Sequence, residues 1–498
     1  MSSARRFTLP TIANESPTVV HLAAEYFPYA RTGGLAEAAW GLHRDQHRSG
    51  LSTMVIVPLY RAARAHTRRL EAAGSPFTIH LGRRTETFQL WRELDPASDT
   101  PTCFLEHDGL FGRDGLYGER GVDYPDNYLR FAAFAAASVA ALPRITTGPV
   151  LLHAHDWHAA LAAVYLRSWF GGDPWYRRIP VVLSVHNGGY QGHFSPGVMP
   201  EIGLPWDLFT FDKLEWYGKT NYLKGGLTHT DMATTVSPTH ADELRTPAGG
   251  FGLHDVYEML GSRFTGVLNG IDQSAWNPAT DSHIAARFSA DNLDGKRACK
   301  ADLQQRFGLP VNPSVPVVAF IGRMATQKGL DIVVHNTALF HFAAQYVFLG
   351  SGDKRLEDAV RALHTALPNR VGVETTFSDP LEHVLIAGAD LYLMPSQYEP
   401  CGLTQMRAQR YGTVPVARRV GGVADTIDDG LTGFLFDAFD ERALVGGIWR
   451  AMTEHRSARA WREMQREGMS REFGWDRAAE RYVDIYARAI ALAARRAW

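Results

Sequence analysis

The chain has 498 residues, which is enough for two to three domains and excludes a single small binding module. Apolar residues at 45% and charged residues at 21% are typical of a globular protein and exclude a disordered, collagen-like or coiled-coil chain. Because 51 Lys and Arg residues balance 53 Asp and Glu residues, no basic surplus favours a nucleic-acid partner.

The cysteines and the N-terminal sequence indicate the compartment. Cys103, Cys299 and Cys401 are widely separated and lack the CxxC spacing of a structural zinc site or the density of a disulfide framework. The first 17 residues have no apolar core of the kind found in signal peptides, and the sequence has no run of about 18 apolar residues. We therefore expect a cytoplasmic protein without a membrane span.

Short apolar runs alternate with longer helical patterns, which is typical of parallel βαβ units. In the first half, the predicted strands are residues 18–24, 53–58, 150–153, 181–185 and 232–236. After a polar helical stretch that ends near residue 309, the second half has predicted strands at 315–321, 345–349, 389–394, 414–417 and 433–436. The pattern predicts an α/β fold with two doubly wound, Rossmann-like domains.

Turn chemistry at Asn269-Gly270 and a proline at position 278 mark the join between the two halves. The sequence thus predicts, in chain order, a flexible N-terminal extension (1–17), an N-terminal Rossmann-like domain (18–267), a hinge (268–277), a C-terminal Rossmann-like domain (278–474) and a C-terminal helix (475–498). The alanine- and arginine-rich final helix has the apolar spacing needed to pack back across the interface.

Polar residues follow the predicted strands, and open parallel sheets bind ligands beyond the carboxyl ends of their strands. Gly33 and Gly34 open a helix after the first strand, where bare N–H groups hold an anion or form only a tight turn. Residues 153–158 read His-Ala-His-Asp-Trp-His, a pattern that fits a polar cleft lining better than a metal site. His186, followed by Asn187 and two glycines, fits a cleft-facing histidine better than a structural one.

The second half has charged residues at equivalent places. Arg323 and Lys328 flank a turn after the first strand and suit a diphosphate, with a solvated basic turn as the alternative. Gly352 closes the next strand in a way that lets backbone approach a ligand. Glu399 precedes a Cys-Gly-Leu turn into a helix, where it caps the helix or binds sugar hydroxyls or ribose.

Two familiar nucleotide-binding patterns are missing from the sequence. No Asp-x-Asp pair is present to hold a divalent metal on a nucleotide-sugar. Gly218-Lys219-Thr220 lacks the glycine that a P-loop needs five residues earlier, since that position is Lys213. A magnesium-dependent transferase of the Asp-x-Asp type and a P-loop ATPase are both disfavoured.

Taken together, these stretches resemble the bacterial glycogen and plant starch synthases, a family of retaining glucosyltransferases of the GT-B type, in which two Rossmann-like domains face a central cleft. The resemblance spans about residues 19–486. It is carried by motifs in the family's order, namely Arg31-Thr-Gly-Gly-Leu, His153-x-His-Asp-Trp-His, His186-Asn-x-x-Tyr-Gln-Gly, Val236-Ser-Pro-Thr, Leu268-Asn-Gly-Ile-Asp, Gln327-Lys-Gly and Pro395-Ser-x-x-Glu-Pro-Cys-Gly-Leu-Thr-Gln.

The resemblance implies roles for three groups of residues. The implied catalytic residues are Glu399, His186, Arg323 and Lys328. Those implied to bind the donor are Arg31, Gly33, Gly34, Asn269, Gly352, Phe377, Cys401, Gly402, Leu403 and Thr404. Those implied on the sugar and acceptor side are Tyr117, Asp156, Asn187 and Gln191. Phe377 stands where the family has a tyrosine that stacks on adenine, so an aromatic ring is kept.

The implied reaction moves glucose from ADP-glucose to the non-reducing end of an α-1,4-glucan, such as glycogen or a maltooligosaccharide, with retention of configuration. The departing phosphate takes the acceptor's proton, and no metal or cofactor is implied. Closure about the hinge would assemble the site and exclude water. The sequence indicates no oligomeric state.

The chain departs from the family at Arg31 and Glu37, which replace a lysine and an aspartate, and in a short insert between Thr426 and Leu431. Arg407 stands where related transferases have a second glutamate, which the synthases also lack. Two alternatives therefore stay open: a related glucosyltransferase that uses UDP-glucose or another acceptor, and a catalytically weak glucan-binding paralogue.

Overall fold

The computed structural model describes residues 6–94, 100–119 and 121–496, which form two compact units. Unit 1 comprises the described residues of 1–236, 241–270 and 475–498, and unit 2 comprises 237–240 and 271–474. The chain passes from unit 1 to unit 2 between Gly270 and Ile271, inside the segment 268–277. Motion about this segment stays a prediction.

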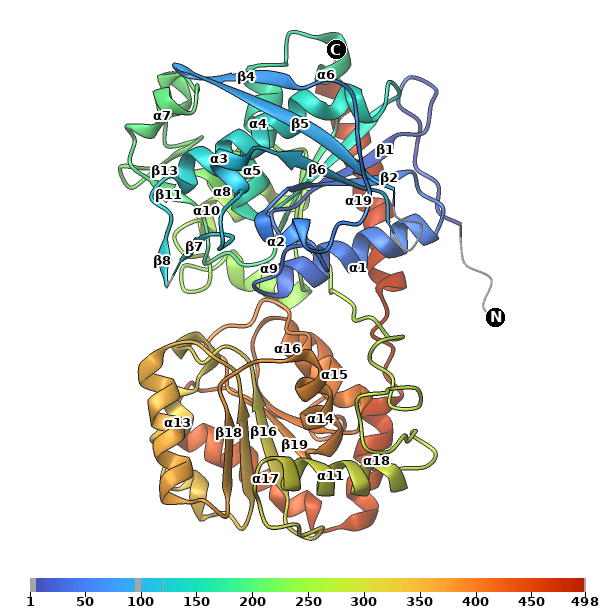
Figure 1. The fold of residues 1–498 in the computed structure, drawn as a ribbon, viewed down its shortest axis with the longest axis vertical. Helices are drawn as coiled ribbons and strands as arrows, with labels where there is room; N and C mark the ends of the chain where they lie inside the picture. The colour runs from blue at the N-terminus through green and yellow to red at the C-terminus, as the bar shows by residue number, and fades with distance from the viewer. Residues whose placement is uncertain (1–5, 95–99, 120, 497–498) are drawn as a thin grey trace. The chain divides into compact units, whose positions relative to one another are not determined.

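Unit 1 is built on a large, mostly parallel sheet (Figure 1). From one edge to the other, its described strands are β15 (Phe264–Gly266), β14 (Met232–Thr235), β10 (Val181–Val185), β9 (Val150–His155), β1 (Thr18–Leu22), β2 (Thr53–Pro58), β6 (Thr102–Glu106), β5 (Arg84–Glu93) and β3 (Leu70–Ala72), and β4 (Phe77–Leu81) also pairs with β5. The strands from β15 to β6 are parallel, whereas β3, β4 and β5 pair antiparallel at one edge.

The central strands of unit 1 are buried on both faces. Because successive side chains point to opposite sides of a strand, each strand contributes to two core clusters. Val20 and Leu152 face a core cluster that includes residues of α4 (Asn127–Ile145) and α5 (Asp156–Ser168). Val19 and Leu151 face a second cluster that includes residues of α19 (Trp475–Arg496). The β-branched and leucine-rich strands therefore form a sheet covered on both sides.

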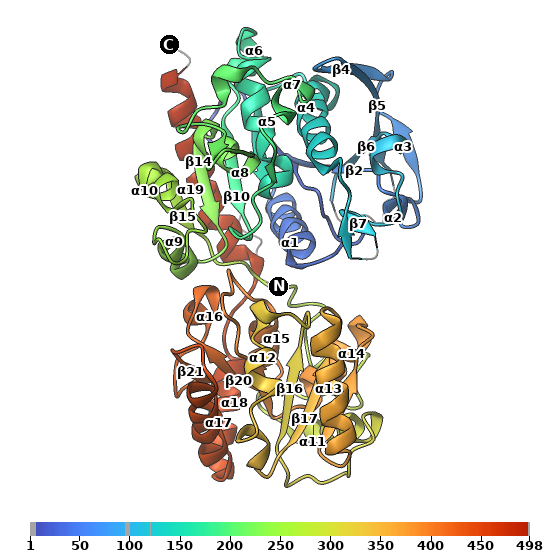
Figure 2. The same ribbon diagram turned by 90° about the vertical axis from the view of Figure 1, so that its left-hand side faces the viewer.

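Helices pack on both faces of this sheet. Figure 2 shows α4, α5 and α8 side by side, and Figure 1 shows α19 beside α1. The other described α-helices of unit 1 are α1 (Gly34–Arg48), α2 (Arg61–Arg64), α3 (Asp108–Phe111), α6 (Pro174–Arg177), α7 (Val198–Glu201), α8 (Tyr222–His229) and α10 (His254–Leu260), while α9 (Pro238–Leu244) begins in the segment 237–240 of unit 2. Two small antiparallel sheets join β11 (His193–Phe194), β13 (Lys219–Asn221) and β12 (Glu215–Trp216), and β7 (Gly118–Glu119) and β8 (Val122–Asp123).

Helix α4 is the one described helix that is long and apolar enough to span a membrane, with a mean hydropathy of 1.2 over its apolar window. However, 72% of that window is buried inside unit 1. Within α4, Arg130 is fully buried, and its guanidinium donates to the carbonyl oxygens of Leu110 and Leu116. These contacts are those of a core helix.

Both termini of the described chain pack on unit 1. The sequence predicts a flexible extension over residues 1–17, of which 1–5 lie outside the described residues. In the structure Leu9 is buried in the same cluster as α19, and the Phe7 N–H donates to the Ser49 carbonyl oxygen at 2.9 Å. Residues 6–17 therefore differ from the expected extension, since burial of Leu9 anchors them.

Unit 2 is a smaller doubly wound domain with a fully parallel sheet. Its described strands, in spatial order, are β18 (Val371–Glu374), β17 (Gln345–Leu349), β16 (Val317–Ile321), β19 (Leu391–Met394), β20 (Val414–Arg418) and β21 (Phe434–Phe436). Its α-helices are α11 (Asp294–Arg306), α12 (Asp331–Val334), α13 (Lys354–Ala366), α14 (Asp379–Gly388), α15 (Thr404–Arg410), α16 (Gly421–Thr426), α17 (Glu441–His455) and α18 (Ala458–Met469). Asp353, Ser378, Asp440 and Ser457 cap the N-termini of α13, α14, α17 and α18.

The predicted α/β class with two doubly wound sheets is confirmed, and each predicted strand has a counterpart in a parallel sheet. Three details differ. The polar stretch before residue 309 becomes helical only from Asp294, in α11. The antiparallel edge β3–β5 was not predicted, because β3 is short and β4 and β5 alternate exposed with buried residues. The short strands β15 and β18 were not predicted either, nor was β6, although it is a mostly buried run of five residues.

Candidate functional site

In unit 1, the loop between β1 and α1 is organised around a buried carboxylate. Glu25 is 4% exposed, and its two oxygens accept hydrogen bonds from the Thr32 N–H at 2.6 Å, the Thr32 hydroxyl at 2.7 Å and the Gly33 N–H at 3.1 Å. Tyr117 donates its hydroxyl to Glu25 at 2.7 Å. The Gly33 N–H, predicted to hold an anion, is thus bonded to the protein's own carboxylate in this structure.

Gly34, the first residue of α1, is placed differently. A Cβ atom added at Gly34 or at Gly33 would meet no described protein atom within 4 Å. Packing inside unit 1 therefore does not require glycine at either position. This open space is consistent with the predicted approach of a ligand to the backbone.

Two of the departures from the family pattern form a single ion pair. The Arg31 guanidinium lies 3.1 Å from a carboxylate oxygen of Glu37, and the two side chains are 27% and 21% exposed. Compared with the lysine and aspartate of the family pattern, both side chains of this pair are longer. Because the pair is partly exposed, solvent weakens its contribution to stability.

At the end of β9, Asp156 is held against the loop that follows β10. Its backbone has a positive φ of 57°, and its side chain accepts the His186 N–H at 2.6 Å. Burial raises the pKa of the Asp156 carboxyl from 3.8 to about 7, although bonds from the His186 and Asn187 N–H groups favour the ionised form. Burial therefore makes this carboxyl group a weaker acid than an aspartate in solvent.

The remaining predicted residues of unit 1 lie around this loop. Tyr117 stacks on His158 with ring centroids 4.7 Å apart, and Asn187 accepts the Gly189 N–H through its side chain at 3.0 Å. Asn269 is half-buried and donates its N–H to the Val236 carbonyl oxygen at 3.3 Å. The site roles of these three residues stay predictions.

Gln191 has a more structural position than the predicted one. It is buried, and its amide nitrogen donates to the carbonyl oxygens of Gly188 and Phe251 at 2.9 and 3.1 Å. Its amide oxygen accepts from Asn221 at 2.7 Å. The side chain therefore joins this loop to Phe251 and to Asn221 of β13, and its role on the acceptor side stays a prediction.

Three buried histidines could bring metal ligands together. Ligand atoms of His21, His153 and His155 lie within 4.8 Å of one another. However, both ring nitrogens of all three already lie at hydrogen-bonding distance from protein groups: Gln46, Tyr486, Ser184, His186 and, between His21 and His155, each other. A cation at this place would have to replace those bonds, so the geometry fits a hydrogen-bonded cluster.

In unit 2, the turn after β16 carries the predicted cations. Lys328 ends the short 3-10 helix η3 (Thr326–Lys328), and its ammonium donates to Glu399 at 2.6 Å. Glu399 is 5% exposed and also accepts the Ser396 hydroxyl at 3.0 Å. Arg323 is exposed and donates to the Gln327 side chain at 3.0 Å. The structure therefore brings Lys328 and Glu399 together.

A glycine allows this contact. Gly329 has φ 72°, and a Cβ there would lie 2.0 Å from the Pro395 carbonyl oxygen. Only glycine lets the η3 turn approach the loop that carries Glu399 so closely. The Gln397 N–H, which donates to the Gln327 carbonyl oxygen at 2.8 Å, fixes the same contact.

The predicted donor-binding glycine Gly352 is also explained by packing. Its N–H donates to Glu357 at 2.8 Å, and a Cβ there would lie 2.5 Å from the Met324 carbonyl oxygen. The loop after β17 thus packs against the loop after β16.

The remaining predicted donor-binding residues follow Glu399 and lead into α15. They are the buried Cys401, Gly402 with φ 70°, Leu403 and Thr404.

Phe377 and Arg407 lie in contrasting environments. Phe377 is 39% exposed in the loop between β18 and α14, where a flat ligand can reach its ring. Arg407 is buried on α15, donates to Glu382 at 2.9 Å and lies 4.3 Å above the Trp276 ring. Position 407 therefore holds the interior of unit 2 together.

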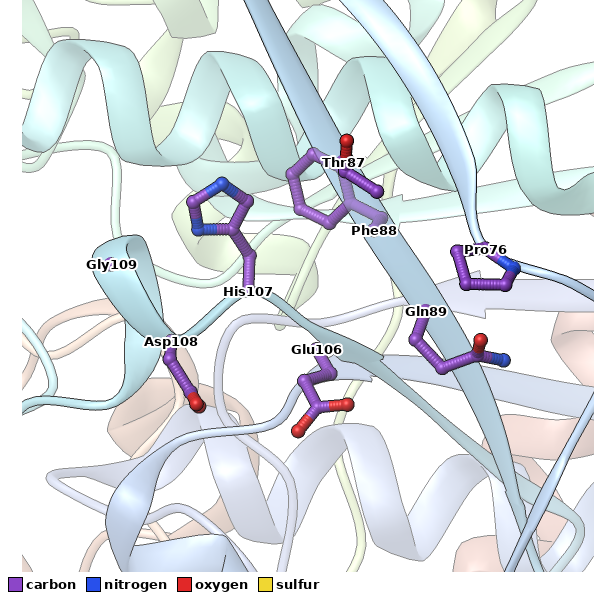
Figure 3. A pocket seen from close by; sticks show the side chains of 8 residues that line it. All are labelled: Pro76, Thr87, Phe88, Gln89, Glu106, His107, Asp108 and Gly109. Atoms are coloured by element: carbon purple, nitrogen blue, oxygen red, sulfur yellow. The ribbon is translucent and has the colours of Figure 1, made fainter.

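A shallow hollow of about 260 Å³ lies elsewhere in unit 1, between β5 and the start of α3 (Figure 3). It is lined by Pro76, Thr87, Phe88, Gln89, Glu106, His107, Asp108 and Gly109, none of which is a predicted site residue. His107 bonds to Glu86 at 2.9 Å, and Glu106 accepts from Trp91 at 2.6 Å. These polar groups are already engaged with the protein, so the hollow gives no indication of a ligand.

Glu25, Ser396, His21 and Gln46 were not predicted as site residues. Glu25 directly follows the predicted strand 18–24, and this position at a strand end was the available signal. Ser396 lies within a motif that was quoted, three residues before Glu399. His21 lies inside the strand itself and gave no signal.

Family models match both halves of the chain. The model described as "Starch synthase catalytic domain" matches residues 18–259, and the model described as "Glycosyl transferases group 1" matches residues 302–468.

Named relatives match almost the whole chain. A protein named "Glycogen synthase" from Anaeromyxobacter sp. (strain Fw109-5) is 43% identical and covers 94% of this chain and 98% of its own length. One of the same name from Syntrophotalea carbinolica is 40% identical with the same coverage. Among solved structures, the catalytic domain of starch synthase IV from Arabidopsis thaliana, bound to ADP and acarbose, is similar with a TM-score of 0.87 and 30% identity, and covers 96% of this chain and 100% of that one.

Proposed function

The chain belongs to the family of glycogen and starch synthases, and from this premise we propose that it moves glucose from ADP-glucose to the non-reducing end of an α-1,4-glucan, with retention of configuration. It is a glycosyltransferase with the GT-B fold, as the resemblance implied. The observation that carries the proposal is the contact of Lys328 with Glu399 beside the exposed Arg323.

Unit 2 would hold the donor. Arg323 offers a planar fork and Lys328 a point charge, and together they would offset the charge that builds on the diphosphate as the glucose–phosphate bond breaks. Glu399 orients the Lys328 ammonium now and would sit beside the glucosyl unit. The exposed Phe377 ring would stack on the base.

Unit 1 would hold sugar hydroxyls with neutral groups. Burial lowers the pKa of His186 to about 3, so this ring is uncharged at neutral pH. Asp156 positions the His186 backbone through a 2.6 Å bond, and Asn187 and Tyr117 lie in the adjacent loops. Hydrogen-bonding groups without full charge suit a neutral sugar.

The proposed step balances without an enzyme nucleophile. The bond between the anomeric carbon and the phosphate oxygen breaks, and a bond to the acceptor's 4-hydroxyl oxygen forms on the same face of the sugar. The hydroxyl proton passes to the departing phosphate oxygen. We propose that the reaction needs no resident metal or cofactor and that the protein binds neither nucleic acid nor a membrane. We also propose that it is cytoplasmic.

The test is the initial rate of labelled glucose incorporation into glycogen from ADP-glucose and from UDP-glucose, with EDTA present throughout and Glu399→Ala as the inactive control. We expect metal-independent transfer from ADP-glucose. Preference for UDP-glucose would contradict the donor assignment. Absence of transfer from both donors would contradict the catalytic assignment and favour a glucan-binding role.

A further inference from the structure

A buried line of hydrogen bonds runs through unit 1 from α1 to His186. The Gln46 amide oxygen lies 2.9 Å from His21 Nε2, and His21 Nδ1 lies 3.0 Å from His155 Nε2. His155 Nδ1 then lies 2.9 Å from His186 Nε2. Gln46, His21 and His155 are each 0% exposed, whereas His186 is partly exposed. The line thus begins with three buried side chains and ends at a histidine that solvent reaches.

Each ring in this line is neutral at pH 7. Burial lowers the pKa of His21 to about 4, that of His155 well below its usual value, and that of His186 to about 3. A neutral imidazole carries one N–H and one bare nitrogen. A histidine that donates through one nitrogen must therefore accept through the other, and the line has a direction.

Gln46 sets that direction. Its amide nitrogen donates to the Tyr486 hydroxyl of α19 at 2.9 Å, so its amide oxygen faces His21 and can only accept. His21 then carries its proton on Nε2 and accepts on Nδ1 from His155 Nε2–H. His155 in turn accepts on Nδ1, so His186 donates through Nε2 and has a bare Nδ1.

The same amide orientation also sets the direction of a second branch, from Tyr486. Because the Tyr486 hydroxyl accepts from Gln46, its own proton goes to His153 Nδ1 at 2.8 Å. His153 then donates through Nε2 to Ser184 at 2.7 Å. Each contact joins one donor to one acceptor, so the amide orientation of Gln46 satisfies both branches.

We propose that Gln46, His21 and His155 are positioning residues that fix the tautomer of His186, so that its bare Nδ1 accepts a hydrogen bond from a substrate hydroxyl. The His186 Nδ1 atom has no hydrogen-bond partner among the described residues, and the ring is partly exposed. With the Gln46 amide oriented as in the structure, the opposite tautomer would leave two donors or two acceptors face to face at one contact of the line, which buried polar groups avoid. The identification of that hydroxyl as a sugar hydroxyl rests on the proposed function. The inferred tautomer of His186 does not depend on it.

The test reads the tautomer directly, in full-length protein with 15N-labelled histidine rings. The His186 signals are assigned by their loss in His186→Gln. We expect a pyrrole-like shift for Nε2 and a pyridine-like shift for Nδ1 in the wild type. A protonated Nδ1 in the wild type would overturn the proposal, whether or not the protein transfers glucose.

Two substitutions at the start of the line sharpen the test. Gln46→Met keeps the volume and removes the acceptor, so His186 should become a mixture of tautomers, with kcat lowered about tenfold and inhibition by ADP unchanged. Gln46→Glu keeps an acceptor toward His21 and should keep the wild-type tautomer. Gln305→Met, at an exposed position on α11, is the matched control and should change neither.

Three results would overturn the proposal: an unchanged His186 tautomer in folded Gln46→Met, loss of the tautomer in Gln46→Glu, or one bound divalent cation per chain whose removal shifts the His21, His153 and His155 signals. The last would make these rings metal ligands. Thermal melting shows whether each variant folds, and if Gln46→Met does not fold, the wild-type and Gln46→Glu spectra still decide.

Discussion

The polar side chains that follow the strands differ in charge between the two sheets. In unit 1, the polar side chains are held by hydrogen bonds in which burial keeps histidines neutral and raises the pKa of Asp156 to about 7. In unit 2, the Lys328 ammonium lies against a buried Glu399 carboxylate, near an exposed Arg323. Neutral groups suit sugar hydroxyls and charged groups suit a diphosphate, and this difference underlies the proposal that unit 2 holds the diphosphate.

The glycines differ in the same way. Gly329 and Gly352 in unit 2 are required by backbone contacts of 2.0 and 2.5 Å that a Cβ would make. Gly33 and Gly34 in unit 1 face open space. A motif glycine therefore has at least two physical origins, and only the structure separates them.

Removing the carboxylate of unit 2 should have the largest effect. Glu399→Ala deletes the partner of Lys328 and should lower kcat about a thousandfold, which corresponds to about 4 kcal/mol of transition-state stabilisation. The thermal melting curve should stay close to that of the wild type. Glu399→Gln, which keeps an acceptor for Ser396, serves as the matched variant. Near-normal turnover in Glu399→Ala would remove this residue from the mechanism.

Removing the cations of unit 2 should weaken donor binding next. Charge-assisted hydrogen bonds contribute about 1.5–3 kcal/mol, so Arg323→Ala and Lys328→Ala should each raise the ADP inhibition constant and the donor KM roughly ten- to hundredfold. Lys354→Ala removes a lysine whose side chain is 82% exposed on α13 and is the matched control. Unchanged ADP inhibition in both variants would refute the diphosphate assignment.

The raised pKa of Asp156 predicts that the stability of the protein depends on pH. A carboxyl whose folded-state pKa is raised from 3.8 to about 7 contributes stability below pH 4 that is lost as pH rises through 7, by up to about 4 kcal/mol. Asp156→Asn keeps an acceptor for the His186 N–H and does not ionise. The difference in Tm between Asp156→Asn and the wild type should therefore shift in favour of the variant as the pH rises from 5 to 8. Parallel curves would contradict the raised pKa, and Asp255→Asn, with a side chain 87% exposed, is the control.

The Arg31–Glu37 pair should give the smallest effect. Because both side chains are partly exposed, their coupling is about 0.2–1 kcal/mol, which is at most about fivefold. Arg31→Lys and Glu37→Asp each shorten the pair and break it, so the double variant should have nearly the kcat/KM of either single variant. Effects that multiply would show that the two residues act independently.

The fold was largely predictable from the sequence because the central strands are buried on both faces and read as apolar runs, such as 181–185 and 414–417. The antiparallel edge was not, since β5 alternates exposed polar and buried residues and lacks such a run. The motif residues Lys328 and Glu399 were predicted, but their contact depends on the close approach at Gly329.

The positioning groups of unit 1 could not be predicted, because their partners are far apart in the sequence. His21 and His155 are 134 residues apart, and Gln46 and Tyr486 are 440 apart. A lone histidine in a strand or a glutamine on a helix has no local pattern that indicates such a partner. The closing of α19 onto unit 1 creates the contact of Gln46 with Tyr486, and only the fold reveals it.

The proposal that unit 2 binds the diphosphate is tested most directly by calorimetric titration of ADP into the wild type, Lys328→Ala and Asp156→Asn. We expect Lys328→Ala to weaken ADP binding at least tenfold, whereas Asp156→Asn should bind ADP with the wild-type affinity. Wild-type affinity in Lys328→Ala together with weakened binding in Asp156→Asn would contradict it.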